Sequence, residues 1–219
     1  LEGIYNWILF PSSKMDPNVP TANKYVGFYT NHDIKVRGIE VRRRDTPLFI
    51  KRMQGEMLEI FKMANDIAGV EMLVPDALAK AQEYINLLRS GQANPLELVI
   101  RRHISQEADE YKNRSTNAEV AKALDEAGIK LQPGEMIEYV IVDASGKKKP
   151  EKATALALYS FDEGYDIEKY TEMALKAVET LLLPFGWNVE RLGIAIGGST
   201  PKKSRRKNLT LQPEQLFTS

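Results

Sequence analysis

The stretch KVRGIEVRRRDTPLFIKR, residues 35–52, marks the point where the chain passes from a strand pattern to a helix pattern. Residues 24–30 and 34–42 are rich in β-branched and aromatic residues, and the turn-like sequence NHD (residues 31–33) lies between them. Two such runs joined by a short polar turn predict a β-hairpin.

A helical region is expected directly after the hairpin. Thr46 is predicted to cap a helix whose first residue is Pro47, because the N–H that proline lacks has no helical partner at that position. A second helix is expected from Pro75 to Gly91, and the remaining pattern predicts helices at residues 117–127 and 166–183 and strands at residues 96–104, 135–143 and 153–159. The sequence therefore predicts an α+β fold, in which a β-hairpin is followed by a mainly helical domain with a small antiparallel sheet.

The length of 219 residues fits one domain, or a small domain with an appendage. With 43% hydrophobic and 27% charged residues, the chain can bury an ordinary core. It has no cysteine and only two histidines, His32 and His103, which excludes disulfide scaffolds, thiolate zinc sites and cysteine nucleophiles. No apolar run is long enough for a membrane span, and the first residues lack the pattern of a signal peptide, so we expect a cytoplasmic protein.

The net charge of zero hides an uneven distribution of charge along the chain. Residues 35–52 carry seven Lys and Arg against two Asp and Glu, and residues 201–219 carry five against one. Residues 53–200 have a net charge of −8. Two basic segments on an acidic body indicate a polyanion contact along one strip of surface. From charge alone, solvated surface faces explain the pattern equally well.

We find no catalytic, metal-binding or cofactor-binding motif in this sequence. Metal-dependent nucleotidyl transfer needs paired carboxylates, usually in an Asp-x-Asp turn, and none occurs. The segment Gly193–Ser199 has the glycine spacing of a phosphate loop, but Ser199 stands where the lysine must be. The chain is therefore not expected to be a self-sufficient enzyme or to bind a cofactor itself.

The residue types that the chain does offer suit a polyanion. Lys24 and Tyr25 combine a cation with an aromatic hydroxyl, and Asp45 is placed to orient a guanidinium group. Arginine makes planar, bidentate contacts to phosphates, and such contacts position a protein on nucleic acid without reading its sequence. The arginines of this set are Arg37, Arg42, Arg43 and Arg44.

At this point the sequence resembles the C-terminal part of archaeal family B DNA polymerases, that is, the last segment of the palm and the whole thumb. Five stretches carry the resemblance in family order and spacing: NKYVG (23–27), VRGIEVRRRDTP (36–47), ELVIRRHISQEADEYK (97–112), EVAKALDEAGIKLQPGEMIEYVIVD (119–143) and YDIEKYTEMALKAVETLLLPFGW (165–187). The sequence departs from the family at Ala22 and Asn23, where more basic residues are usual, and at Thr116 and Asn117, where many members have Pro-His.

The resemblance implies domain boundaries and a DNA-binding role. Residues 1–45 would form the end of the palm, residues 46–192 the thumb, and residues 193–219 a flexible basic tail. Lys24 and Tyr25 would contact the primer strand near its 3′ end. The nascent duplex would lie beside Arg37, Arg42, Arg43, Arg44 and Asp45, with Arg101, Arg102, Tyr111 and Lys112 as lesser candidates for DNA contacts.

The resemblance also implies a partner. In the family the metal-binding aspartates, the fingers and the exonuclease domain all lie N-terminal to this region. We therefore expect a large catalytic polymerase subunit on a separate chain, which would hold Mg²⁺ and bind primer–template DNA together with this chain as a heterodimer. A C-terminal fragment of a longer polymerase is the alternative origin of the sequence. A free-standing DNA-binding regulatory relative and a scaffold that links polymerase to the sliding clamp are alternative functions.

Two further sets of residues are candidates for protein contacts. The first is the apolar segment near the start of the sequence, which forms either the interface to the catalytic subunit or a local core: Tyr5, Trp7, Ile8, Leu9 and Phe10. The second is the tail, which would add a sliding-clamp contact or nonspecific DNA affinity: Lys202, Lys203, Arg205, Arg206, Lys207, Leu216 and Phe217.

Overall fold

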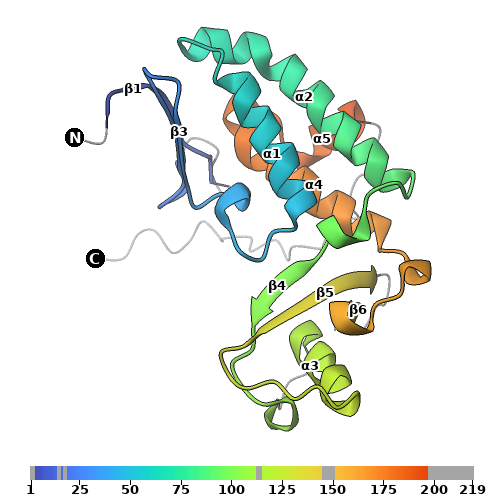
Figure 1. Ribbon diagram of the computed structural model, residues 1–219. Helices are drawn as coiled ribbons and strands as arrows, with labels where there is room; N and C mark the ends of the chain where they lie inside the picture. The colour runs from blue at the N-terminus through green and yellow to red at the C-terminus, as the bar shows by residue number, and fades with distance from the viewer. Residues whose placement is uncertain (1–2, 14–15, 17–18, 112–114, 145–150, 197–219) are drawn as a thin grey trace, which may run out of the picture.

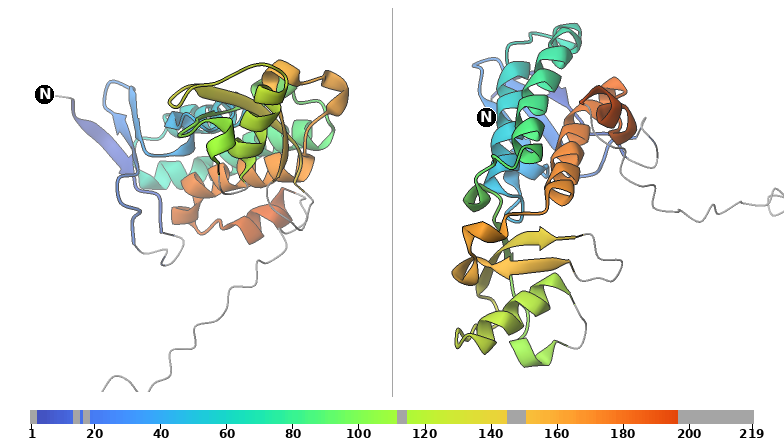
Figure 2. Two further views of the ribbon diagram at one scale, coloured as in Figure 1. Left: turned by 90° about the horizontal axis from the view of Figure 1, so that it is seen from below. Right: turned by 90° about the vertical axis from the view of Figure 1, so that its right-hand side faces the viewer.

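The computed structural model describes residues 3–13, 16, 19–111, 115–144 and 151–196. These residues form two lobes (Figure 1). The first lobe contains a three-stranded sheet and the helices α1, α2, α4 and α5, and the second contains another three-stranded sheet and helix α3. The chain enters the second lobe after α2 and returns to the first through α4, so the lobes are joined by two connections (Figure 2).

The sheet of the first lobe consists of β1 (Tyr5–Leu9), β2 (Tyr25–Tyr29) and β3 (Ile34–Arg37), in that order and antiparallel. Strands β2 and β3 form the predicted hairpin. Strand β3 is shorter than predicted, because Gly38 has a φ of +72° and the 3-10 turn Glu40–Arg42 follows. The apolar segment at the start of the chain pairs with β2 and adds a third strand, which the sequence pattern did not predict.

One face of this sheet packs on the helices and forms part of the core. Trp7 stacks on Phe28 with ring centroids 3.8 Å apart, and its indole N–H donates to the carbonyl of Ala64 in the turn after α1 (3.2 Å). Leu9 and Val26 are buried on the same face. Of the two roles predicted for residues 5–10, the structure thus gives Trp7 and Leu9 the local core.

The helical bundle of the first lobe consists of α1 (Leu48–Phe61), α2 (Ile67–Arg89), α4 (Ile167–Leu182) and α5 (Val189–Ala195). Helix α1 packs on α2 and α4, and α5 packs on α4. Their shared core is fully enclosed and includes Met53, Met57, Phe61, Ile85, Leu88, Tyr170, Leu181 and Leu182. This packing fixes α1 directly behind the connection from the first sheet.

Two predicted helix starts were wrong, and one helix was not predicted. Pro47 lies just before the first helical residue of α1, and no side chain caps that helix, so Thr46 is not its cap. Helix α2 begins at Ile67 rather than at Pro75, because the carboxylate of Asp66 accepts the N–H of Gly69 (2.8 Å) and caps the helix there. Pro75 lies inside α2 on its exposed side, where the carbonyl that it leaves unbonded faces solvent. Helix α5 is the helix that was not predicted, and it follows the last predicted helix, residues 166–183.

The second lobe is built on the sheet β4 (Ile100–His103), β5 (Met136–Asp143) and β6 (Lys152–Ala155), which is antiparallel in that order. Helix α3 (Thr116–Glu126) packs against β5 and β6. The prediction of a mixed α and β fold with small antiparallel sheets is confirmed. Strand β4 is shorter than predicted because Pro95–Glu97 form a 3-10 turn.

Candidate nucleic-acid interface

The arginine-rich connection between the first sheet and α1 is held in place by the buried side chain of Gln54. Its amide oxygen accepts the N–H of Val41 (2.6 Å), and its amide nitrogen donates to Glu40 (2.9 Å) and to the carbonyl of Ala177 on α4 (3.0 Å). Glu40 also accepts the hydroxyl of Thr180 (3.1 Å). One side chain thus ties the connection to two helices.

The residues that follow this anchor point are exposed arginines. Arg42, Arg43 and Arg44 are all exposed, and they come directly after the N–H that Gln54 binds. A backbone anchored in this way presents the three guanidinium groups from one fixed place on the surface. The arrangement suits contact with a polyanion, because the backbone that carries these arginines is already held in place before binding.

Asp45 holds two of the predicted arginines. It accepts two hydrogen bonds from Arg43 (3.0 and 2.8 Å) and one from Arg102 on β4 (3.2 Å). The hydrogen bond with Arg43 holds the pKa of Asp45 below its ordinary value, and the pKa of Arg43 is raised in turn. Since Arg102 belongs to the second lobe, Asp45 joins the arginines of the two lobes into one cationic group.

The Lys-Tyr pair lies beside Arg37 at the other end of the connection. Tyr25 is directly opposite Arg37 in the β2–β3 register, so the two side chains share one face of the sheet. Gly38 allows this close approach: a Cβ atom there would lie 2.4 Å from the carbonyl oxygen of Asn23, next to Lys24. These residues lie at one end of the chain segment from Lys24 to Asp45, which is called the arginine-rich edge.

The lesser candidates are placed less uniformly. Arg101 pairs with Glu138 on the neighbouring strand (2.5 Å), and the hydroxyl of Tyr111 accepts the N–H of Ser105 (3.2 Å), which holds a local turn. Neither interaction connects the residue to Asp45. Lys112 lies outside the described residues, as do Lys202, Lys203, Arg205, Arg206, Lys207, Leu216 and Phe217.

A cleft of about 340 Å³ lies between the two lobes, next to the Asp45 group. Its lining includes Arg43, Asp45 and Arg102 together with Lys169 and Lys176 of α4. The ammonium group of Lys169 pairs with Glu151 (2.6 Å), and Lys176 pairs with Glu172. Sequence reasoning missed these two lysines, because only the return of α4 brings them beside residues 43–45.

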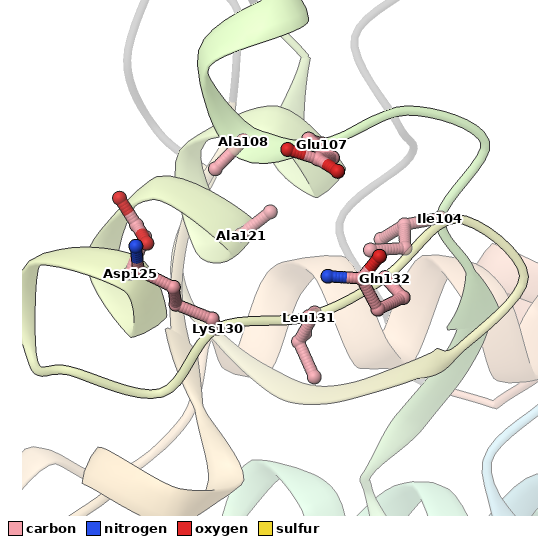
Figure 3. A pocket seen from close by; sticks show the side chains of 8 residues that line it. All are labelled: Ile104, Glu107, Ala108, Ala121, Asp125, Lys130, Leu131 and Gln132. Atoms are coloured by element: carbon pink, nitrogen blue, oxygen red, sulfur yellow. The ribbon is translucent and has the colours of Figure 1, made fainter.

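A second, smaller hollow of about 130 Å³ lies in the second lobe under α3 (Figure 3). Its lining residues are Ile104, Glu107, Ala108, Ala121, Asp125, Lys130, Leu131 and Gln132. None of these residues lines the cleft between the lobes. The hollow is thus separate from the arginine-rich edge.

The described part of the chain contains no group of three or more His, Cys, Asp or Glu side chains close enough to hold a metal ion. The carboxylates of the candidate interface, Glu40 and Asp45, are engaged by Gln54, Thr180 and arginines. These side chains do not fit a two-metal site. Among the described helices, none has both the length and the apolar character that a membrane span requires.

The fold and this edge define a two-lobed α/β protein with a surface suited to a polyanion. The sequence model of DNA polymerase family B matches residues 20–184 of the chain. The chain therefore belongs to DNA polymerase family B.

Similar proteins agree with this assignment. The chain is 32% identical over 176 residues to a DNA polymerase of Thermococcus hydrothermalis, and the aligned region covers 78% of this chain and 10% of the relative. It is 31% identical over 176 residues to a DNA polymerase of Thermococcus gorgonarius, and the aligned region covers 78% of this chain and 22% of the relative. The fold is similar to that of the family B DNA polymerase from Pyrobaculum calidifontis, with a TM-score of 0.62 at 21% identity over 83% of this chain and 22% of the other. The chain thus spans between a tenth and about a fifth of the length of these relatives.

Proposed function

We propose that this chain is a non-catalytic part of a family B DNA-directed DNA polymerase, and that it completes the palm and supplies the thumb that grips primer–template duplex. Residues 1–45 would belong to the palm and residues 46–192 to the thumb. The observation that carries the proposal is the group of Arg43, Asp45 and Arg102, which joins the arginine-rich edge to the second lobe in a chain of this family. The catalytic aspartates and their Mg²⁺ would lie on a separate catalytic chain.

The arginine-rich edge would act by positioning DNA. Asp45 orients the guanidinium groups of Arg43 and Arg102 and removes much of their rotational freedom. These groups can therefore donate hydrogen bonds to a phosphate with little further ordering. Holding the duplex along this edge would slow its release and align the primer 3′ end with the partner's catalytic centre. In this way the chain would raise the rate of nucleotide addition at a catalytic centre on its partner.

The exposed apolar residues in and beside β1 are the proposed contact with the catalytic chain. Phe10 is 51% exposed and Ile4 is 73% exposed, while Trp7 and Leu9 face the core of this chain. The interface that we propose thus uses Ile8 and Phe10 from the predicted set, while Tyr5 is stacked on Tyr29. The predicted contact of residues 202–217 with a sliding clamp stays a prediction.

The test is primer extension by a catalytic family B chain, with and without this chain. We expect the wild-type chain to raise the length of product several-fold, and the triple variant Arg42→Ala/Arg43→Ala/Arg44→Ala to lose that gain while still co-purifying with the partner. The matched control, Lys80→Ala/Lys122→Ala/Lys130→Ala, removes the same charge from α2 and from the region of α3. It should keep the gain.

Two outcomes would contradict the proposal. If both triple variants behave alike, the effect depends on net charge and the arginine-rich edge has no special role. If extension is unchanged by the wild-type chain while the chain binds duplex alone, a free-standing DNA-binding relative of the polymerase is the better description. The variant Lys24→Ala/Tyr25→Ala tests the other end of the edge in the same assay.

A further inference from the structure

The sheet of the first lobe has a second face, which points away from the helical bundle. The first face carries Trp7, Leu9, Val26 and Phe28 and is buried. Because side chains alternate along a strand, Tyr25, Gly27 and Tyr29 of β2 lie on the opposite face. Figure 1 shows the sheet at one side of the bundle, with the helices against only one of its faces.

A β-bulge in β1 brings a third tyrosine onto this outer face. Strict alternation would place Tyr5 on the same face as Trp7 and Leu9. The register between β1 and β2 shifts between Tyr5 and Trp7, so that Tyr5 lies opposite Tyr29 while Trp7 lies opposite Phe28. The outer face therefore carries three half-buried tyrosines.

The hydroxyls of these tyrosines gather at one place. The rings of Tyr5 and Tyr29 are stacked with centroids 4.4 Å apart, and the hydroxyl of Tyr29 donates to that of Tyr5 (3.2 Å). The ring of Tyr5 crosses above Gly27, where a Cβ atom would lie only 2.2 Å from it. The pKa of Tyr5 is raised, chiefly through its hydrogen-bonded pairing with Tyr29, while Lys35 and Tyr25 act to lower it. All three groups thus lie close to the Tyr5 hydroxyl.

Basic residues complete the outer face on β3. Lys35 lies opposite Gly27, and Arg37 lies opposite Tyr25. Neutral hydroxyl donors next to an ammonium group form a hydrogen-bonding set for an anionic oxygen. Tyr25 and Tyr29 are four residues apart, about 13 Å at about 3.3 Å per residue. A DNA strand carries one phosphate charge per about 3.4 Å, so that length spans about four nucleotide steps.

We propose that Tyr5, Tyr29 and Lys35 bind a backbone phosphate of a DNA strand that runs across the outer face toward Arg37. The inference rests on the proposed function, since it extends the DNA contact beyond Lys24 and Tyr25 to a second position on the same sheet. The hydroxyl of Tyr5, which accepts a hydrogen bond from Tyr29, donates to a phosphate oxygen, and Lys35 supplies the charge. The stack of Tyr5 on Tyr29 and the small size of Gly27 keep the donors in place before DNA arrives.

The experiment measures binding of the full chain to a labelled primer–template duplex and to the same template as a single strand, by fluorescence anisotropy. The variant Tyr5→Phe/Tyr29→Phe removes both hydroxyls and keeps the stacked rings. We expect it to bind duplex about tenfold more weakly, as the loss of one hydrogen bond to a charged group predicts. Lys35→Gln should lower the slope of log affinity against log salt concentration by about one.

The control variant Tyr84→Phe/Tyr159→Phe removes two other hydroxyls that donate hydrogen bonds, one on α2 and one in the second lobe. It should bind duplex like the wild-type chain. Melting temperatures of all variants show whether a loss of binding reflects unfolding. Comparing the two DNA forms shows whether the phosphate belongs to a paired or an unpaired strand, and weakened binding of either form supports the site.

The proposal is overturned if the Tyr5→Phe/Tyr29→Phe variant binds both DNA forms within twofold of the wild-type chain. It is also overturned if DNA binding is unchanged but co-purification with the catalytic chain is lost, because the outer face is then a protein interface. If the wild-type chain neither binds DNA nor raises primer extension, the proposed function fails as well. If the wild-type chain and the variant both bind DNA and raise primer extension normally, only this inference fails and the proposed function stands.

Discussion

Replacing Gln54 by leucine is expected to destabilise the protein, because the buried side chain of Gln54 hydrogen-bonds both the arginine-rich connection and helix α4. The side chain is fully buried and makes three hydrogen bonds, to Val41, Glu40 and Ala177. Leucine fills a similar volume and can make none of them. The change therefore tests the polar network and not the packing.

The magnitude follows from the groups that lose their partner. The N–H of Val41 is left unpaired, which costs about 1–3 kcal/mol. The carbonyl of Ala177 lies inside α4 and keeps its helical partner, so it loses only a second hydrogen bond, worth about 0.5–1.5 kcal/mol. Glu40 is only half-buried and keeps its hydrogen bond from Thr180, so its contribution is small. Burial of the leucine side chain offsets about 1 kcal/mol of the cost. We expect the free energy of unfolding to fall by about 2 kcal/mol in total.

Thermal and urea denaturation of the full chain measure this change. A loss of about 2 kcal/mol corresponds to a fall in Tm of about 4–8 °C for a chain of this size. Gln82→Leu, an exposed position on α2, is the matched control and should change Tm by no more than about 2 °C. A Gln54→Leu protein that melts within about 2 °C of wild type would refute the reasoning.

The remaining predictions concern Asp45 and two glycines. Arg43 holds the pKa of Asp45 below its ordinary value, so this ion pair stabilises the folded state above a pH of about 4 and is lost as the pH falls through the lower folded pKa. Asp45→Asn should thus cost up to about 1 kcal/mol in urea denaturation at pH 7 and clearly less at pH 3; an equal cost at both would contradict the assignment. Gly38→Ala forces a Cβ atom to 2.4 Å from the Asn23 carbonyl at a φ of +72°, and should cost at least about 2 kcal/mol in the same assay. Gly55→Ala, in the open on α1, should instead stabilise by about 0.5–1 kcal/mol, and a similar effect of both changes would show that the close approach at Gly38 is absent.

Local pattern determined which segments of this protein become strands and helices. The hairpin around residues 31–33 and the helices α3 and α4 form close to the predicted positions, because turn residues and apolar periodicity act over short distances. The same pattern failed at the start of α2, where Pro75 has the sequence signature of a helix start. The cap at Asp66 decided the boundary, because its carboxylate accepts an otherwise unpaired N–H group in the first turn of α2. Pro75 supplies no such hydrogen bond; it only lacks an N–H group of its own.

The composition of the candidate interface could be read from the sequence, since arginines and a Lys-Tyr pair are visible as residue types. Their grouping could not, because Arg102 meets Asp45 across 57 positions of the chain and Lys169 reaches the same cleft only when α4 returns. The tertiary structure also decided the two faces of the first sheet. A one-residue bulge between Tyr5 and Trp7 sends one side chain outward and the other into the core, and alternation along the strand gives no sign of it.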